Sequence, residues 1–160
     1  VTLAREYPDT PIVLDHFGIP AGVFGPIGLR TGATAAARAD IMRLWRERMT
    51  TLAGHRNVSV KLSGLAMPVL GFGHERWGNI GDQATLAEMI GPFVEHIITH
   101  FGTERVMYGS NYPIDKPNSR MDMQVGALID CLSRWGPDAL RKVFRDNALR
   151  TYSIEEVSAP

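Results

Sequence analysis

The chain has 160 residues, of which 44% are hydrophobic and 21% charged, a composition typical of one globular domain. Seventeen basic residues balance seventeen acidic ones, which excludes a strong general attraction to nucleic acid or to an anionic membrane and favours a small-molecule substrate. A single cysteine excludes an internal disulfide, and no apolar run reaches the roughly 18 residues of a membrane helix. We therefore expect a cytoplasmic protein.

The first third of the chain predicts the end of a helix, a strand and a complete helix. Residues 3–7 fit the last turn of a helix, and the apolar run Ile12–Leu14 is typical of a buried parallel strand. The glycine-rich segment 21–32 is long for a connector, and it fits either a binding loop or a disordered surface loop. From 35 to 53 hydrophobic residues recur at helical spacing, which predicts an amphipathic helix.

The middle of the chain repeats this order. Hydrophobic and polar residues alternate over 58–64, which predicts a strand, and a second long loop spans 66–81. The apolar stripe over 86–101 predicts the clearest helix, with Asp82 or Thr85 as its N-terminal cap and Gly102 just after its end.

The last part predicts a strand over 106–108, a helix over 121–132 on a stripe that includes Met121, Leu128 and Ile129, and a final helix over 140–152. Alternating strands and helices indicate an α/β fold with parallel strands. About three such units make either a small open sheet or part of a closed eight-unit barrel. We expect one partial domain over residues 1–152 and a tail over 153–160.

Polar side chains follow each predicted strand. Because the carboxyl ends of parallel strands meet at one edge of a sheet, His16, Ser63 and Asn111 are expected to converge there. Alternation also predicts which residues share the inward face, namely Ile12, Leu14 and His16 in the first strand, Ser59, Lys61 and Ser63 in the second, and Met107, Gly109 and Asn111 in the third.

These residue types allow several chemistries. The imidazole of His16 is able to ligate a metal or to move a proton near neutral pH, although a structural histidine that bonds a loop carbonyl is an equally good interpretation. Asn111 is able to orient a carbonyl or a water but not to act as a base. Lys61 is either an active-site cation or the partner of a carboxylate contributed from elsewhere on the same face.

Other candidates have weaker support. His55, His96 and His100 are expected on the surface, whereas His74 and Arg76 in the second loop are candidate substrate contacts, with a solvated loop as the alternative. The sequence has no zinc-finger spacing, no phosphate-cradling glycine motif and no nucleophile elbow, which excludes several enzyme classes.

Four segments together resemble the amidohydrolase-related family of TIM-barrel hydrolases, and within it the metal-dependent, lactonase-like branch. They are residues 12–20 (IVLDHFGIP), 57–65 (NVSVKLSGL), 71–76 (GFGHER) and 105–115 (RVMYGSNYPID). The resemblance implies that the chain is the C-terminal part of a TIM barrel, with its three strands corresponding to the sixth, seventh and eighth. The His-X-His pair of the family's first strand has no counterpart, so we expect a fragment of a longer protein or a truncated reading frame.

The resemblance also implies site roles. His16 matches the family histidine that binds a divalent metal, zinc or manganese, and Asn111 stands where the family usually has the aspartate that binds metal and accepts a proton. Asn111 cannot ionise, so metal-independent chemistry is an open alternative, with Asp115 or Glu75 as a substitute base.

Three hypotheses follow. The first is a hydrolase that opens a lactone or another cyclic carboxylic ester by activated water. The second is a metal-dependent decarboxylase of the same fold. The third is a non-catalytic half-barrel that binds a ligand or forms homo-oligomers through its exposed edges. We expect the 160-residue chain by itself to be inactive.

Overall fold

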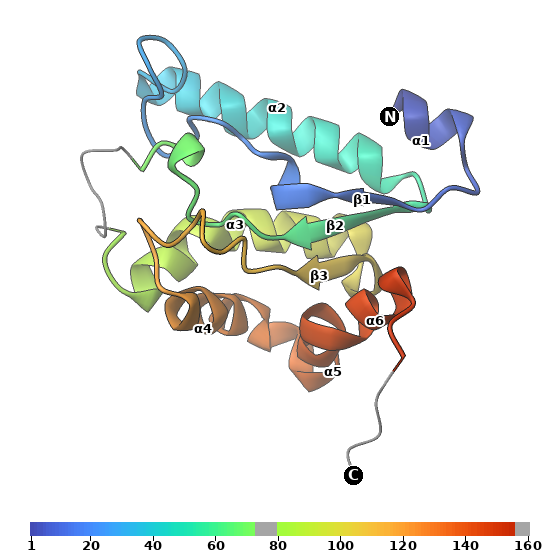
Figure 1. Cartoon of the computed structure of the whole chain (residues 1–160). Helices are drawn as coiled ribbons and strands as arrows, with labels where there is room; N and C mark the ends of the chain where they lie inside the picture. Colours follow the sequence, from blue (N-terminus) through green and yellow to red (C-terminus); the bar gives the residue numbers. More distant parts are fainter. Residues whose placement is uncertain (73–79, 156–160) are drawn as a thin grey trace.

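The computed structural model describes residues 1–72 and 80–155. Its centre is a three-stranded parallel sheet in the order β1-β2-β3, formed by Ile12–Leu14, Val58–Leu62 and Val106–Tyr108. The helices are α1 (Thr2–Glu6), α2 (Ala35–Ala53), α3 (Gln83–Phe101), α4 (Met121–Leu132), α5 (Gly136–Arg141) and α6 (Asn147–Tyr152), with a π-helical turn, Lys142–Asp146, between the last two. In Figure 1 the helix α2 runs beside β1, α3 lies behind the sheet, and α4 to α6 lie on the side of β3.

The observed element order confirms the α/β interpretation, and the three strands run parallel as expected. Within the described ranges, no helix has the length and apolar character needed to span a bilayer.

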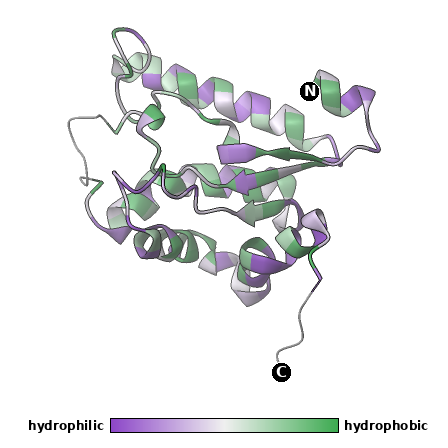
Figure 2. Ribbon diagram, viewed as in Figure 1, coloured by the Kyte–Doolittle hydropathy of each residue, from purple (hydrophilic) through white to green (hydrophobic). Residues whose placement is uncertain are grey.

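The hydrophobic core lies between the sheet and the helices. Val58, Val60 and Leu62 on β2 are fully buried, and the same cluster contains Phe93 and Ile97 of α3. Figure 2 shows α2 in alternating hydrophobic and hydrophilic bands, as expected for a helix with one buried side. The caps of α3 also agree with the sequence, since the Asp82 side chain accepts a hydrogen bond from the Thr85 backbone N–H at 2.9 Å.

The predicted face of β1 was wrong. Ile12 is paired with Val58 and Leu14 with Val60, and residues paired in this register point to the same side of a parallel sheet. Ile12 and Leu14 therefore pack with the helix-facing residues, and Val13 shares the other face with Ser59. The prediction for β3 was correct, because Met107 is paired with Lys61.

The predicted stripe of α4 was also partly wrong. Met121 and Ile129 are 44% and 40% exposed, whereas Gln124, Ala127 and Leu128 are fully buried. The prediction placed only hydrophobic residues on the buried side of α4, so it did not find an orientation in which the polar Gln124 is buried.

The loop after β1 is ordered by contact with the loop after β2, so the hypothesis of a disordered surface loop was wrong. The backbone N–H of Phe24 donates to the Leu70 carbonyl at 2.8 Å, and the rings of Phe24 and Phe72 lie 5.0 Å apart. A Cβ on Gly25 would lie 2.3 Å from the carbonyl oxygen of Gly71, so the two backbones approach to a distance that only glycine permits.

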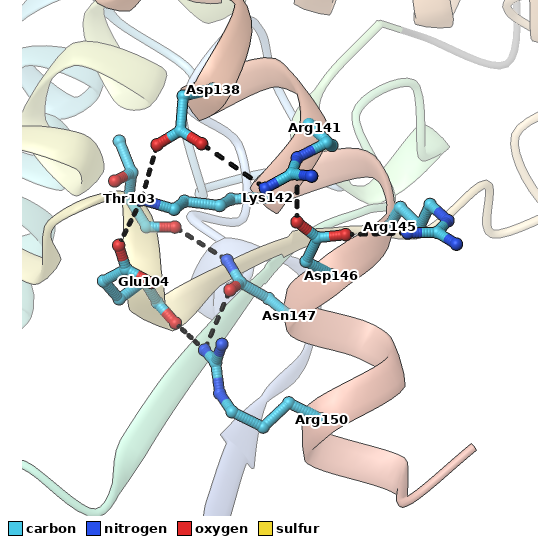
Figure 3. Close-up of polar contacts among 9 residues, drawn as sticks. All are labelled: Thr103, Glu104, Asp138, Arg141, Lys142, Arg145, Asp146, Asn147 and Arg150. Atoms are coloured by element: carbon cyan, nitrogen blue, oxygen red, sulfur yellow. Dashed lines mark hydrogen bonds and ion pairs between the residues drawn. The ribbon is translucent and has the colours of Figure 1, made fainter. Parts of the chain in front are cut away.

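The C-terminal helices are fastened to β3 by buried and exposed polar contacts (Figure 3). The fully buried Asn147 donates from Nδ2 to the carbonyls of Thr103 and Val106, both at 2.7 Å. Around it, Lys142 pairs with Glu104 at 2.5 Å and with Asp138 at 2.6 Å. The final helix therefore has a fixed position against β3, the strand that leads to Asn111.

Candidate active site

His16 and Ser63 meet at the carboxyl ends of β1 and β2. The imidazole Nδ1 lies 2.9 Å from the Ser63 hydroxyl oxygen, and the backbone N–H of His16 donates to the same oxygen at 3.2 Å. Ser63 is 2% exposed, so the hydroxyl that holds the ring is itself rigidly placed. The convergence of these two residues was predicted correctly.

The backbone after β1 explains how this contact forms. Asp15–Gly18 leaves the strand in a tight turn in which His16 and Phe17 have φ of 53° and 42°. Two successive residues in the left-handed region cancel the alternation of the strand and turn the imidazole toward β2. Gly64, with φ of 64°, provides the space, because a Cβ there would lie 3.0 Å from Nδ1 of His16.

Lys61 lies on the face of β2 that points away from the helices. Its Nζ is 3.0 Å from Oδ1 of Asp15 and 5.3 Å from the ring centre of Tyr152. Contact with Tyr152, and then with Asp15, raises the pKa of Lys61 above its usual value, so this lysine stays charged. Lys61 is therefore a cation paired with a carboxylate on the neighbouring strand end.

Asn111 and Asp115 form the second part of the site, on the loop after β3. Nδ2 of Asn111 donates to Oδ1 of Asp115 at 2.7 Å. The other carboxylate oxygen accepts the backbone N–H of Ala66 at 3.1 Å and the Gln124 side chain at 3.3 Å. Asp115 therefore folds back onto Asn111 within one turn and joins the loops of two strands.

Asp115 is fully buried. Burial raises the pKa of its carboxyl group above the ordinary value, although the hydrogen bonds from Ala66 and Asn111 act in the opposite direction. Both carboxylate oxygens have donors, and neither is exposed to solvent. A general base must reach the water that it deprotonates, so this conformation does not present Asp115 as one.

The β2 and β3 ends are adjacent. The Gly109 backbone N–H donates to the Leu62 carbonyl at 3.2 Å, and a Cβ on Gly109 would lie 3.1 Å from Cβ of Ser63. Gly109 thus allows the loop that carries Asn111 to pass close to the Ser63–His16 pair.

The remaining predicted residues have different outcomes. His74, Glu75 and Arg76 lie outside the described residues. His96 is not a plain surface residue, because it is half-buried between α2 and α3 and its Nε2 lies 3.1 Å from the Arg46 carbonyl oxygen. Burial lowers the pKa of His96.

The described residues do not by themselves form a metal site. Within residues 1–72 and 80–155 no group of three or more His, Cys, Asp or Glu side chains is placed to hold an ion. His16 fits as a single ligand, because Nδ1 is hydrogen-bonded and Nε2 has no hydrogen-bond partner in that part of the chain. A ring nitrogen fixed by a hydrogen bond, with the other nitrogen open, is the usual arrangement of a metal-binding histidine.

Sequence reasoning missed Asp15 and Gln124. The sequence does indicate the place of Asp15, since this residue lies two positions after Val13 and so continues the face of Val13 beyond the strand. Gln124 is a polar residue four positions before Leu128 on the helix, and such a residue on a buried stripe indicates a polar partner inside.

Comparisons with known proteins agree with this architecture. A family model described as Amidohydrolase matches residues 1–154. The chain is 31% identical over 163 aligned residues to an L-fucono-1,5-lactonase of Burkholderia ambifaria, covering 99% of this chain and 47% of that protein. It is also 33% identical over 152 residues to the uncharacterized protein y4mH of Sinorhizobium fredii, covering 95% of this chain and 42% of that protein.

Solved structures show the same fold. An amidohydrolase from Burkholderia multivorans with bound zinc superposes with a TM-score of 0.75 at 21% identity, covering 96% of this chain and 48% of the other. A putative 2-pyrone-4,6-dicarboxylic acid hydrolase from Pseudomonas putida gives a TM-score of 0.60 at 21% identity over 98% of this chain and 48% of the other. The chain spans less than half the length of each of these four proteins. It belongs to the amidohydrolase family, and one of its relatives there is a lactonase.

Proposed function

We propose that this chain is part of a hydrolase that opens a lactone or another cyclic carboxylic ester. The observation that carries the proposal is the grouping of His16 and Ser63, joined at 2.9 Å, with Asn111 on the adjacent loop. The 31% identity to an L-fucono-1,5-lactonase supports this substrate class. We further propose that residues 1–152 supply about three of the eight units of a TIM barrel, whose active site lies at the carboxyl ends of the strands.

In the proposed reaction, water adds to the ester carbonyl carbon and the ring C–O bond breaks. A proton passes from the attacking water to the departing oxygen, and the product is a hydroxy acid. His16 is the residue placed to carry this proton or to bind a metal, and its ring is held by Ser63. The amide oxygen of Asn111 orients the water or the substrate.

We propose further contacts to substrate from Lys61, whose cation stays charged beside Asp15, and from His74 and Arg76, which lie outside the described residues. A divalent metal, zinc or manganese, is part of the proposal for the whole protein, with His16 as the ligand from this chain. When bound, such an ion polarises the carbonyl and acidifies water. Metal-independent hydrolysis is the alternative, because Asn111 replaces an ionisable ligand.

The test uses the protein in its longest natural form, purified without added metal. Metal content is measured by mass spectrometry, and hydrolysis of sugar 1,5-lactones and of a pyrone dicarboxylate lactone is followed by acid release. His16→Ala is compared with His55→Ala, a histidine outside the site. Turnover lost in His16→Ala and kept in His55→Ala supports the proposal, and metal that is present and lost in the same variant assigns the ligand.

Turnover without metal would favour the metal-independent alternative. No turnover on any lactone would overturn the lactonase assignment, and release of carbon dioxide from an aromatic acid would identify a decarboxylase instead.

As a second candidate, we propose that the chain associates with another copy through its sheet edges. Among the described residues, β1 and β3 each have a strand neighbour on one side only, and an unpaired edge is a template for another strand. Light scattering of the purified chain tests this candidate. A dimer or larger species would support it, and a well-folded monomer would contradict it.

A further inference from the structure

The contacts of Asp115 carry an inference that rests on the proposed function and deepens it. We propose that Asp115 is a positioning residue that aims the amide of Asn111 into the site, and that it is not the base that replaces the missing family aspartate.

The direction of the Asn111 amide follows from its partner. An ionised carboxylate only accepts hydrogen bonds, so the atom that contacts Asp115 Oδ1 at 2.7 Å must be the Asn111 nitrogen. The amide oxygen then points away from Asp115. No hydrogen bond within the described part of the chain engages this oxygen, which leaves it available to a water or a substrate group. Asn111 has φ of 52°, so its backbone is also held in the left-handed region.

Burial separates the Asp115 carboxylate from solvent. It is fully buried, and its two oxygens receive hydrogen bonds from Asn111, Ala66 and Gln124. Gln124 is also fully buried, so the carboxylate is enclosed on the side of α4. Three donors that hold one buried carboxylate make a rigid support for Asn111.

The same network joins the loops of β2 and β3. Asn118 donates from its side chain to the Ala66 carbonyl at 2.8 Å, while the Ala66 N–H donates to Asp115. Ala66 lies three residues after Ser63, which holds His16. Asp115 therefore fixes the position of Asn111 relative to the loop that follows β2.

Asn118 provides a matched control. It is 3% exposed and belongs to the same loop and network, but its side-chain amide donates to the Ala66 carbonyl, whereas Asp115 holds the Asn111 amide. If Asp115 acted only by stabilising the fold, Asn118→Ala and Asp115→Asn would reduce turnover in proportion to their effects on stability.

The experiment measures kcat, KM and unfolding by urea in the longest natural form of the protein, with a lactone that the wild type hydrolyses. Variants are Asp115→Asn, Asn111→Ala, the double variant and Asn118→Ala. We expect Asp115→Asn to lower kcat about 10–100-fold with little change in KM, as loss of a supporting partner does. The double variant is expected to be no slower than Asn111→Ala, and Asn118→Ala to keep kcat within about threefold at similar loss of stability.

Two results would overturn the proposal. One is loss of the acidic limb of the pH–rate profile in Asp115→Asn while Asn111→Ala stays active, which would identify Asp115 as the base. The other is an equal loss of kcat in Asn118→Ala, which would make the role structural. If Asp115→Asn does not fold, the test rests on Asn111→Ala, which keeps the carboxylate and removes the amide that we propose to act on water or substrate. A kcat that is unchanged in Asn111→Ala would then overturn the proposal.

A separate readout distinguishes this proposal from the proposed function. The side-chain NH₂ signals of Asn111 are followed by NMR, and a bond to a buried carboxylate predicts slow exchange with water in the wild type and fast exchange in Asp115→Asn. Slow exchange in a protein that hydrolyses no lactone would leave the positioning role standing and the function refuted. Fast exchange in the wild type would refute the positioning role whatever the activity.

Discussion

Nδ1 of His16 lies 2.9 Å from Oγ of Ser63, although the pairing register of β1 and β2 by itself predicts these two side chains on opposite faces of the sheet. Leu14 is level with Val60, so a straight continuation would point position 16 toward the helices. The left-handed conformations of His16 and Phe17 instead bring the imidazole to the Ser63 hydroxyl. The site therefore depends on one hydroxyl and one tight turn.

We expect Ser63→Ala to lower the free energy of unfolding by about 1–3 kcal/mol, because the buried hydroxyl bonds both the backbone N–H and the ring of His16. Urea denaturation measures the change. Ser59→Ala is the control, since Ser59 lies on the same face of β2 and its hydroxyl has no hydrogen bond to another residue within 1–72 and 80–155. We expect a change within about 0.5 kcal/mol. Equal effects of the two substitutions would contradict the role of Ser63.

Gly64→Ala is expected to displace His16. Its φ of 64° costs an alanine about 1–2 kcal/mol, and the added Cβ would lie 2.8 Å from Cε of Met67 and 3.0 Å from Nδ1 of His16. Gly28→Ala is matched for backbone strain, with φ of 60° and no atom within 4 Å of the added Cβ. Only Gly64→Ala should shift the ring resonances of His16 in NMR spectra. Unchanged resonances would show that the ring does not lie against Gly64.

Asn147→Asp is expected to be strongly destabilising. The substitution would replace the Nδ2 donor with a carboxylate oxygen that faces the carbonyls of Thr103 and Val106 in a fully buried position. The carboxylate would keep its contact with the Arg150 guanidinium, which donates to Oδ1 of Asn147 at 2.8 Å, but its repulsion from two buried carbonyls should cost about 3–5 kcal/mol. Asn147→Ala, which adds no charge, should cost about 1–3 kcal/mol. Calorimetric or urea unfolding measures both variants.

Lys142→Ala is the comparison in the same region of Figure 3. Its partners Glu104 and Asp138 are 58% and 62% exposed, so solvent weakens both ion pairs and we expect a much smaller loss of stability than for Asn147→Asp. A loss as large as that of Asn147→Asp would mean that the exposed ion pairs, rather than the buried amide, fasten the last helices.

Cys131 is expected to react slowly with thiol reagents. Burial raises the pKa of its thiol from 9.0 to about 11, so at pH 8 only about one molecule in a thousand carries the thiolate. The reaction rate with a disulfide reagent should rise about tenfold per pH unit up to pH 10, and the urea-unfolded chain should react as an ordinary thiol. Because the folded chain keeps this proton to higher pH than the unfolded chain, the free energy of unfolding should also fall between pH 9 and pH 11. A fast reaction at pH 8 in the folded state would contradict the burial.

The sequence predicted the elements and their order, because periodicity and caps are local. The helix over 35–53, the Asp82 cap and the parallel strands were found where expected. The meeting of His16 with Ser63 also followed from the rule that parallel strands present their carboxyl ends together. Even the exclusion of a disulfide needs only the count of cysteines.

Side-chain faces and partners required the tertiary structure. The register of β1 against β2 reversed the predicted face of Ile12 and Leu14, because alternation fixes which residues share a face but not which face is buried. The pairing of Lys61 with Asp15 and the enclosure of Asp115 by Gln124 join residues from separate loops and helices, and no local pattern encodes those distances. Composition and periodicity thus determined the layers, whereas long-range packing decided which polar groups face the site and which support it from behind.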